Sequence, residues 1–205
     1  MLFLIRHGET YWNADGRLQG QLDTELNPRG RDQARQAGTI LASVARGLAD
    51  ATMVASPLSR ACESLEILAS QLVALGALES PPSFTTDERL KELCFGRWEG
   101  MTWKEVRRND PANYAARNAD IWNVAPPGGE SYADLARRVG PLLGSLPEGA
   151  VVVSHGGIAR IALHLLASAT PDEAARAPIR QGDVLMIEAG TASWASGALV
   201  GAEAG

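Results

Sequence analysis

Short apolar runs alternate along this chain with longer stretches in which apolar residues recur every three or four positions. The runs at residues 2–5, 52–55, 151–153 and 184–188 have the length and composition of buried strands. The longer stretches predict amphipathic helices over residues 28–44, 58–72, 131–146 and 158–167. Alternating strands and helices of this kind predict an α/β fold with three layers, α/β/α, around a mostly parallel central sheet.

Polar residues mark the starts of three of these helices. Asn27 and Ser56 are each followed by proline, the order of an N-cap and a first helical residue. Ser131 and Asp134 have the spacing of a capping box, with aspartate in place of the usual glutamate or glutamine. The sequence therefore predicts that helices begin directly after Asn27, Ser56 and Ser131.

The periodic pattern weakens between about residues 81 and 130. Short pieces there carry Trp98, Trp103 and Trp122 among charged residues, and residues 126–129 read Pro-Pro-Gly-Gly. We expect a cap-like, irregular helical insertion over one end of the sheet, inside a single domain that spans residues 1–205. Packing is the expected role of the aromatic side chains, and contact with a substrate stays open. We expect the Ala/Gly-rich end from about Gly197 to be frayed.

The exits of three predicted strands carry the polar groups of greatest chemical interest. These are Arg6 and His7, residues 56–60 with Arg60, and His155 with Gly156. In open α/β sheets, ligands bind beyond the carboxyl ends of the strands, so these groups are expected to converge. Two guanidiniums, two imidazoles and two helix N-termini together suit a tetrahedral oxyanion, and phosphate fits them better than carboxylate does.

A histidine surrounded by arginines favours its neutral form, and a neutral imidazole is a competent nucleophile toward phosphorus. The leaving alkoxide then needs a proton donor. The acidic residues Glu88, Glu92 and Glu99 in the irregular segment are the candidates, and spacing alone does not choose among them.

Composition limits the classes of partner and the cellular compartment that we expect for this protein. The chain of 205 residues is 45% hydrophobic and carries a net charge of −5, so no general attraction to nucleic acid or to an anionic membrane is expected. Cys62 and Cys94 fit no CxxC spacing, and the start of the chain lacks a signal peptide pattern, so we expect a cytoplasmic protein. No carboxylates have metal-ligand spacing, so no metal or other cofactor is expected. A homodimer is compatible with the sequence, which leaves the oligomeric state open.

Several motifs together resemble the histidine phosphatase superfamily in its phosphoglycerate-mutase-like branch. Residues 4–10 read Leu-Ile-Arg-His-Gly-Glu-Thr, with Asn13 following. The further matches, in family order, are residues 18–20, 26–30, 56–61, 92–100, 129–131 and 154–157. They extend over nearly the whole chain, between residue 2 and about residue 188. One departure is Ser64, where the family commonly has threonine.

The resemblance implies roles for individual residues. His7 would be the nucleophile that forms a phosphohistidine, and Glu92 would be the general acid, because it occupies the first glutamate of the pattern E-x-x-F-G-x-W-E-G. The phosphate-binding residues implied are Arg6, Asn13, Gln19, Arg60, His155 and Gly156. Glu88 is retained as a second candidate for the acid role.

The resemblance leaves more than one function open. The sequence of residues 95–100 and the absence of a long insertion favour the phosphatases over the true mutases. Within the phosphatases, residues 98–114 are similar to those of α-ribazole phosphatases and broad-specificity phosphatases. We therefore expect a phosphomonoester hydrolase acting on a small phosphorylated metabolite, with α-ribazole 5′-phosphate as one candidate. The alternatives are a cofactor-dependent phosphoglycerate mutase and a non-catalytic module that binds a phosphorylated ligand.

Some charged residues are expected to have no part in this chemistry. His164 lies in an apolar helical stretch with no motif around it, so a structural role is predicted. The doublets Arg107-Arg108 and Arg137-Arg138 are predicted to lie on exposed helix faces.

Overall fold

A six-stranded mixed sheet forms the centre of the computed structural model, which describes residues 1–197. The strands are β1 (Leu2–Arg6), β2 (Met53–Ala55), β3 (Thr85–Thr86), β4 (Val151–Ser154), β5 (Val184–Glu188) and β6 (Thr191–Ala195). Their order is β3-β2-β4-β1-β5-β6. The first four in that order are parallel to one another, and β5 and β6 continue the sheet antiparallel. The predicted mostly parallel sheet is thus confirmed, with an antiparallel edge.

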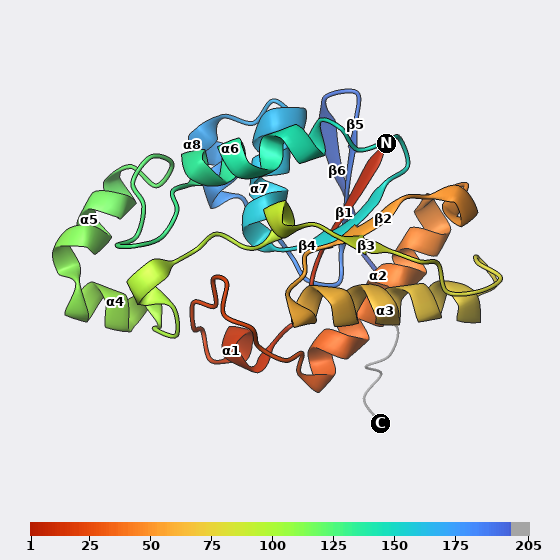
Figure 1. Cartoon of the computed structure of the whole chain (residues 1–205), viewed down its shortest axis with the longest axis horizontal. Helices are drawn as coiled ribbons and strands as arrows, with labels where there is room; N and C mark the ends of the chain where they lie inside the picture. The colour runs from red at the N-terminus through yellow and green to blue at the C-terminus, as the bar shows by residue number, and fades with distance from the viewer. Residues whose placement is uncertain (198–205) are drawn as a thin grey trace.

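Helices cover both faces of this sheet (Figure 1). They are α1 (Tyr11–Ala14), α2 (Pro28–Val44), α3 (Ser59–Ala74), α4 (Trp103–Asn109), α5 (Pro111–Ala119), α6 (Tyr132–Leu143), α7 (Gly156–Leu166) and α8 (Pro171–Arg176). Three short 3-10 helices are η1 (Leu48–Asp50), η2 (Glu88–Leu90) and η3 (Gly96–Trp98). Helices α2 and α3 lie on one side of the sheet, and α6, α7 and α8 lie on the other. The predicted three-layer α/β/α architecture is confirmed.

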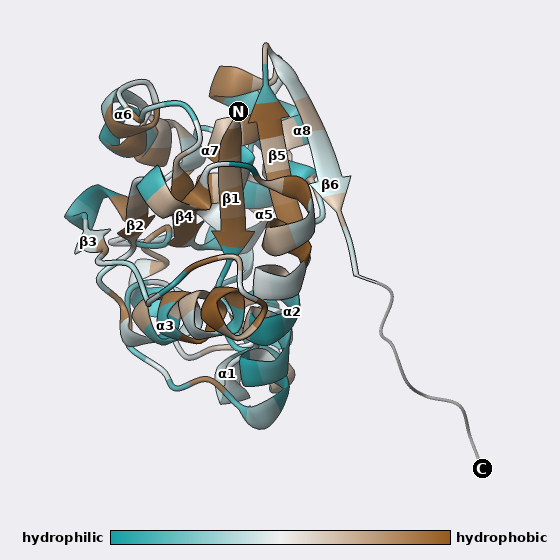
Figure 2. Ribbon diagram, turned by 90° about the vertical axis from the view of Figure 1, so that its right-hand side faces the viewer, coloured by the Kyte–Doolittle hydropathy of each residue, from teal (hydrophilic) through white to brown (hydrophobic). Residues whose placement is uncertain are grey.

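The two faces of each strand supply two separate cores, because successive side chains of a strand point to opposite faces. Leu2 and Leu4 of β1 pack with α6 and α7, whereas Phe3 and Ile5 pack with α2 and α3. Val152 joins the first core in the same way. Figure 2 shows the apolar strands enclosed between helices that turn polar surfaces outward. This burial explains why the central strands read as continuous apolar runs.

Two of the three predicted helix starts are confirmed. Asn27 caps α2 by accepting a hydrogen bond from Gly30, and Ser131 and Asp134 form the predicted capping box of α6. The third start is wrong. Helix α3 begins at Ser59 with Leu58 as its N-cap, and no side chain caps it. Ser56 instead directly follows β2, and its hydroxyl forms a hydrogen bond with His155.

The segment over residues 81–130 contains β3, η2, η3, α4 and α5. Helices α4 and α5 project away from the sheet at the left of Figure 1. Their small core is formed by Leu18, Trp98 and Val106. The description of this segment as a cap within one domain stays a prediction.

Two elements near the end of the chain were not predicted, namely α8 and β6. Both are short, and β6 is mostly exposed, so neither has the apolar pattern of a core element. The end expected to fray, beyond Gly197, lies outside the described residues. Within residues 1–197, no helix has the length and apolarity that a membrane crossing requires.

Candidate active site

The carboxyl ends of three adjacent parallel strands bring the predicted residues together. His7 follows β1, Ser56 follows β2 and His155 follows β4. The rings of His7 and His155 meet edge to face, with centroids 5.0 Å apart. A cavity of about 290 Å³ opens beside them. Its lining includes seven of the eight predicted residues, which are Arg6, His7, Asn13, Gln19, Arg60, Glu92 and Gly156.

His7 is buried and held in one tautomer. Its Nδ1 lies 2.7 Å from the carbonyl oxygen of Gly8, so Nδ1 carries the proton and Nε2 carries the lone pair. Burial lowers the pKa of His7 well below its usual value, and the charges of Arg60 and Arg6 lower it further. The Gly8 carbonyl acts in the opposite direction and is the weaker effect. His7 is therefore a neutral imidazole with an unprotonated Nε2 at neutral pH.

His155 is oriented by a residue that the sequence analysis assigned to another role. Its Nε2 lies 2.7 Å from Oγ of Ser56, and both side chains are fully buried. The Nδ1 atom of His155 is buried and has no hydrogen-bond partner in the described part of the chain. Burial and the charge of Arg60 lower the pKa of His155 well below its usual value. With the Ser56 hydroxyl as donor to Nε2, the proton of the neutral ring is on Nδ1. His155 is the one predicted residue that does not line the cavity, and it lies directly behind His7.

Arg6 and Arg60 are held by backbone carbonyls, and among residues 1–197 no carboxylate forms a close ion pair with either guanidinium. Arg6 donates to the carbonyl of Ile179, and Arg60 donates to those of Gly20 and Leu22. The Asp23 carboxylate is 4.0 Å from Arg60. The Nε atoms of both arginines are buried and have no hydrogen-bond partner among the residues that the structure describes. Burial lowers the pKa of each, yet a guanidinium stays charged at neutral pH. Two such cations, with unused donors, suit a phosphoryl group.

Glu92 lies between η2 and η3 and faces the same cavity. Its Oε1 accepts hydrogen bonds from the backbone N–H groups of Leu93 and Gly157, at 2.8 and 3.0 Å. Among the described residues, no donor is bonded to Oε2, which leaves that oxygen for a substrate. A Cβ at Gly157 would lie 2.3 Å from Oε1 of Glu92 and would displace that carboxylate oxygen from its present position.

The other two acidic candidates lie elsewhere. Glu88 is 76% exposed and pairs with Lys91, and it does not line the cavity. Glu99 accepts hydrogen bonds from the backbone N–H groups of Gln21 and Phe95. The geometry thus favours Glu92 among the three, a choice that residue spacing left open.

Asn13 and Gln19 lie at the cavity wall with their side chains partly engaged. The Oδ1 atom of Asn13 accepts from the Thr10 backbone at 3.2 Å and from Gln181 at 3.0 Å. Gln19 accepts a short hydrogen bond from the Thr24 hydroxyl. Their roles in phosphate binding stay predictions.

The aromatic residues of the segment 81–130 divide into two groups. Trp98 is buried and donates its indole N–H to Asp110, and Trp122 stacks on Tyr132 and touches His164. Trp103, in contrast, lines the cavity. His164 also bonds the carbonyl of Ala169, 2.8 Å away, in agreement with its predicted structural role.

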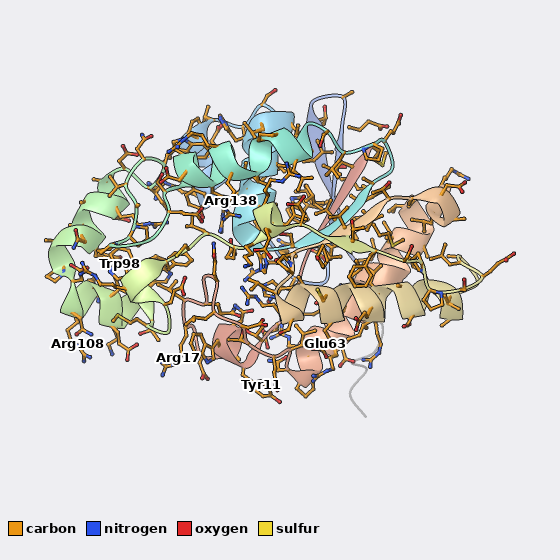
Figure 3. All side chains as sticks on the ribbon, viewed as in Figure 1. Tyr11, Arg17, Glu63, Trp98, Arg108 and Arg138 are labelled. Carbon is orange, nitrogen blue, oxygen red and sulfur yellow. The ribbon has the colours of Figure 1, made fainter. Side chains whose placement is uncertain are left out.

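Sequence reasoning missed several residues at or near the site. Ser64 donates to the Arg60 carbonyl and accepts from the Gly8 backbone, so it ties the His7 loop to α3. Arg138 was predicted to be exposed, yet it is only 21% exposed and bonds the segment that carries Glu92. Its neighbour Arg137 is exposed as predicted, and so is Arg108 (Figure 3). The sequence did contain a signal that Arg138 faces inward. Residues three or four positions away on the same helix belong to the core, as does its neighbour Val139.

Arg117 and Arg160 are two further cavity residues that no motif indicated. Arg117 is 5% exposed, which is unusual for an arginine. Within residues 1–197, no group of three or more His, Cys, Asp or Glu side chains has the arrangement of a metal site.

Comparison with known proteins relates the chain to one family. The model of the histidine phosphatase superfamily (branch 1) matches residues 2–199. A glucosyl-3-phosphoglycerate phosphatase of Mycolicibacterium vanbaalenii is 39% identical over 170 residues, which cover 77% of this chain and 69% of the relative. A probable phosphoglycerate mutase of Salmonella paratyphi C is 35% identical over 160 residues, covering 76% and 69%.

A solved structure agrees with this relationship. The crystal structure of a putative α-ribazole-5′-phosphate phosphatase from Escherichia coli K-12 superposes with a TM-score of 0.75 at 26% identity. The superposition covers 95% of this chain and 94% of the other.

Proposed function

The chain belongs to the histidine phosphatase superfamily (branch 1), and from that premise we propose that it is a metal-independent phosphomonoester hydrolase that works through a phosphohistidine at His7. One observation carries the proposal. The neutral His7, with its proton on Nδ1, lies beside two guanidiniums whose Nε atoms lack partners. This arrangement offers a nucleophile and charge compensation at one place.

The first half-reaction follows from these positions. Nε2 of His7 attacks phosphorus, and the bond from phosphorus to the ester oxygen breaks. Glu92 gives its proton to the leaving oxygen, so a neutral alcohol departs and the carboxylate remains. Arg6, Arg60 and the Nδ1–H of His155 stabilise the negative charge of the equatorial oxygens.

The second half-reaction regenerates the enzyme. The Glu92 carboxylate takes a proton from water, and the water oxygen attacks the phosphoryl group. The bond from phosphorus to Nε2 breaks, which yields inorganic phosphate and neutral His7. Atoms and charges balance without a metal, because the two arginines supply the positive charge that a metal ion supplies in kinases, and neutral His155 adds a hydrogen-bond donor.

The substrate is a small phosphorylated metabolite on this proposal. The cavity of about 290 Å³ suits a small molecule. α-Ribazole 5′-phosphate and glucosyl-3-phosphoglycerate are candidates, because similar proteins are named for these activities.

A phosphoglycerate mutase is the second candidate, favoured by the similarity to a probable mutase. It shares the first half-reaction and differs in passing the phosphoryl group to a second phosphorylated alcohol. A module that only binds ligands is the weaker alternative, because His7, Glu92 and His155 are all present and brought together.

Phosphate release from a panel of metabolite phosphomonoesters tests the proposal. We expect release that survives EDTA and disappears in His7→Ala. The same panel includes 3-phosphoglycerate with and without 2,3-bisphosphoglycerate. Isomerisation with little phosphate release would identify a mutase, and a strict Mg²⁺ requirement would contradict the mechanism above.

A further inference from the structure

Strand β5 runs opposite to its neighbour β1, and this direction brings a further segment of the chain to the phosphate site (Figure 2). Ile5, near the end of β1, pairs with Val184, the first residue of β5. The residues just before β5 therefore lie at the edge of the sheet where His7 follows β1. None of these residues lies in a recognised motif, and the mechanism above assigns them no role.

The segment between α8 and β5, residues 177–183, bonds two residues of the cavity wall. The carbonyl of Ile179 accepts from Nη1 of Arg6 at 2.9 Å. Two positions later, Nε2 of Gln181 donates to Oδ1 of Asn13 at 3.0 Å. The first contact uses a backbone carbonyl, which any residue at that position supplies. The second depends on the side chain of Gln181.

The backbone beside Gln181 is held against helix α2. Gly182 has a φ of +86°, in the left-handed region that favours glycine, and a Cβ there would lie 3.3 Å from Cβ of Gln33. The chain therefore turns into β5 directly after Gln181 and close to α2. This turn presents the Gln181 side chain to the site from a fixed point.

The side-chain amide of Asn13 has its oxygen engaged and its nitrogen open. Oδ1 accepts from the backbone N–H of Thr10 at 3.2 Å, within the capping box of α1, and from Gln181. An amide oxygen has two lone pairs, so these two donors use both of them. Among residues 1–197, no acceptor is bonded to Nδ2, and Asn13 lines the cavity. The bonds to Oδ1 thus leave the N–H groups of Nδ2 for a ligand.

The direction of this amide decides whether it attracts or repels a phosphoryl group. Nδ2 offers two N–H donors, which suit phosphoryl oxygens, whereas Oδ1 is an acceptor only and would repel them. The bond from Thr10 is at the long end of the range for N–H···O. Gln181 adds a second, shorter bond, and it places a donor opposite Oδ1.

We propose that Gln181 is a positioning residue of the phosphate site, which orients the Asn13 amide so that Nδ2 donates to the phosphoryl group. The inference rests on the proposed function, because it concerns how the same site binds phosphate. Gln181 does not line the cavity, so it acts through Asn13.

Gln181→Met tests the proposal, because it keeps the length of the side chain and removes the donor. We expect the Kd for inorganic phosphate, measured by calorimetric titration, to rise about 3- to 10-fold. The KM for a phosphomonoester should rise by a similar factor, and kcat should change by less than about threefold, because the contact with phosphate is made before and during the reaction. An unchanged Kd would overturn the proposal.

Gln181→Glu reverses the polarity of the contact. A carboxylate only accepts hydrogen bonds, so Nδ2 of Asn13 would turn toward it and Oδ1 would turn toward the phosphoryl group. We expect the Kd for phosphate to rise further than in Gln181→Met, by about 10- to 100-fold. An effect smaller than that of Gln181→Met would count against an orienting role.

A double-mutant cycle distinguishes positioning from a general structural role. Asn13→Ala alone should weaken phosphate binding, because it removes the amide. In that background Gln181→Met should change the Kd by less than about twofold, because the group that Gln181 orients is gone. If Gln181→Met has the same effect with and without Asn13, it acts through the structure in general and the proposal is wrong. The same holds if Asn13→Ala binds phosphate as the wild-type protein does.

Gln71→Met is the matched control. Nε2 of Gln71, on α3, donates to the hydroxyl of Thr39 on α2 at 3.2 Å, so this variant loses the same kind of bond between two elements. Neither residue lines the cavity. We expect phosphate binding to stay within about twofold of the wild-type value. A loss as large as that in Gln181→Met would remove the support for a specific role of Gln181.

The positioning role can fail separately from the phosphatase function. If no ester is hydrolysed, including 4-nitrophenyl phosphate, the proposed function fails, and the titration with phosphate still decides the role of Gln181. Weaker binding in Gln181→Met that requires Asn13 would support the role without catalysis. A wild-type protein that binds no phosphate would overturn it.

Discussion

At the scale of single residues, hydrogen bonds decide which atoms can react. The bond from Nδ1 of His7 to the Gly8 carbonyl leaves Nε2 as the nucleophile, and the Ser56 hydroxyl orients His155. The sequence predicted both histidines from their place after apolar strands. It could not predict the contact between Ser56 and His155, because a serine before a proline also has the pattern of a helix cap. The choice between a cap and a partner of His155 depends on the neighbouring strand β4, which is distant in the sequence.

The same scale explains why Glu92 could not be selected from spacing. Glu88, Glu92 and Glu99 all occur in one irregular segment, and only the folded chain shows which of them faces His7. Two backbone N–H donors fix Oε1 of Glu92 and leave Oε2 for the leaving oxygen.

Replacing Glu92 by glutamine tests its role as the acid. We expect the first turnover of an alkyl phosphate to slow by about 10²- to 10⁴-fold, because the alkoxide would leave without a proton. For 4-nitrophenyl phosphate the phenolate leaves readily, so the loss in that first turnover should be less than about 10-fold. Rapid-quench measurement of alcohol release gives the first-turnover rate for each of the two substrates. Equal losses would count against Glu92 and return attention to Glu88.

At the scale of elements, one ion pair joins helix α6 to the segment that carries Glu92. Arg138 donates to Glu130 through two nitrogens, both at 2.8 Å, and to the carbonyls of Arg89, Lys91 and Glu92. Glu130 in turn accepts from the Cys94 backbone. Figure 3 places Arg138 on the inner side of α6, above this segment. We therefore regard Arg138 as a positioning residue for Glu92.

Arg138→Met should destabilise the protein by about 2 kcal/mol, because it leaves Glu130 and several carbonyls without their donor. It should also slow turnover of alkyl phosphates more than that of 4-nitrophenyl phosphate, which is the signature of a misplaced acid. Arg137→Met is the matched control, since the neighbouring side chain is 79% exposed. The positioning role is excluded if Arg138→Met retains the wild-type ratio of the two rates.

Elements with strong apolar periodicity were predictable, and short polar ones were not. β1, β4, α2 and α7 have patterns that tertiary packing reinforces. Helix α8 has only six residues, and strand β6 is held mainly by pairing with β5. Their existence depends on partners that the local sequence does not reveal.

At the scale of the whole molecule, the burial of two neutral histidines makes stability depend on pH. The pKa values of His7 and His155 are lowered in the folded state, whereas an exposed histidine in the unfolded chain has a pKa near 6.5. Below about pH 6.5 the unfolded chain therefore binds more protons than the folded one. Stability is retained above that pH and falls as the pH decreases.

We expect the free energy of unfolding to decrease between pH 6.5 and 5 by up to about 1.4 kcal/mol per pH unit for each of these histidines. Urea unfolding at several pH values measures the slope. Carboxylates stay largely ionised in this window, so the histidines dominate the change. His7→Gln and His155→Gln should each make the slope shallower. A slope that neither substitution changes would contradict the burial of neutral imidazoles.

The distribution of charge across the molecule also has a functional consequence. The chain carries a net charge of −5, yet one cavity gathers five arginines around a single carboxylate. The net charge of the sequence predicted no general attraction to anions. The cavity nevertheless favours anions, because a few cations placed around it determine the electrostatic potential inside.

Trapping of the phosphoenzyme tests the central claim most directly. The wild-type protein is mixed with a ³²P-labelled phosphomonoester, quenched in alkali, which preserves phosphohistidine, and digested for mapping. The account predicts label on the peptide that contains His7, with none in His7→Ala. Phosphate release without any trapped label, or label that persists in His7→Ala, would contradict it.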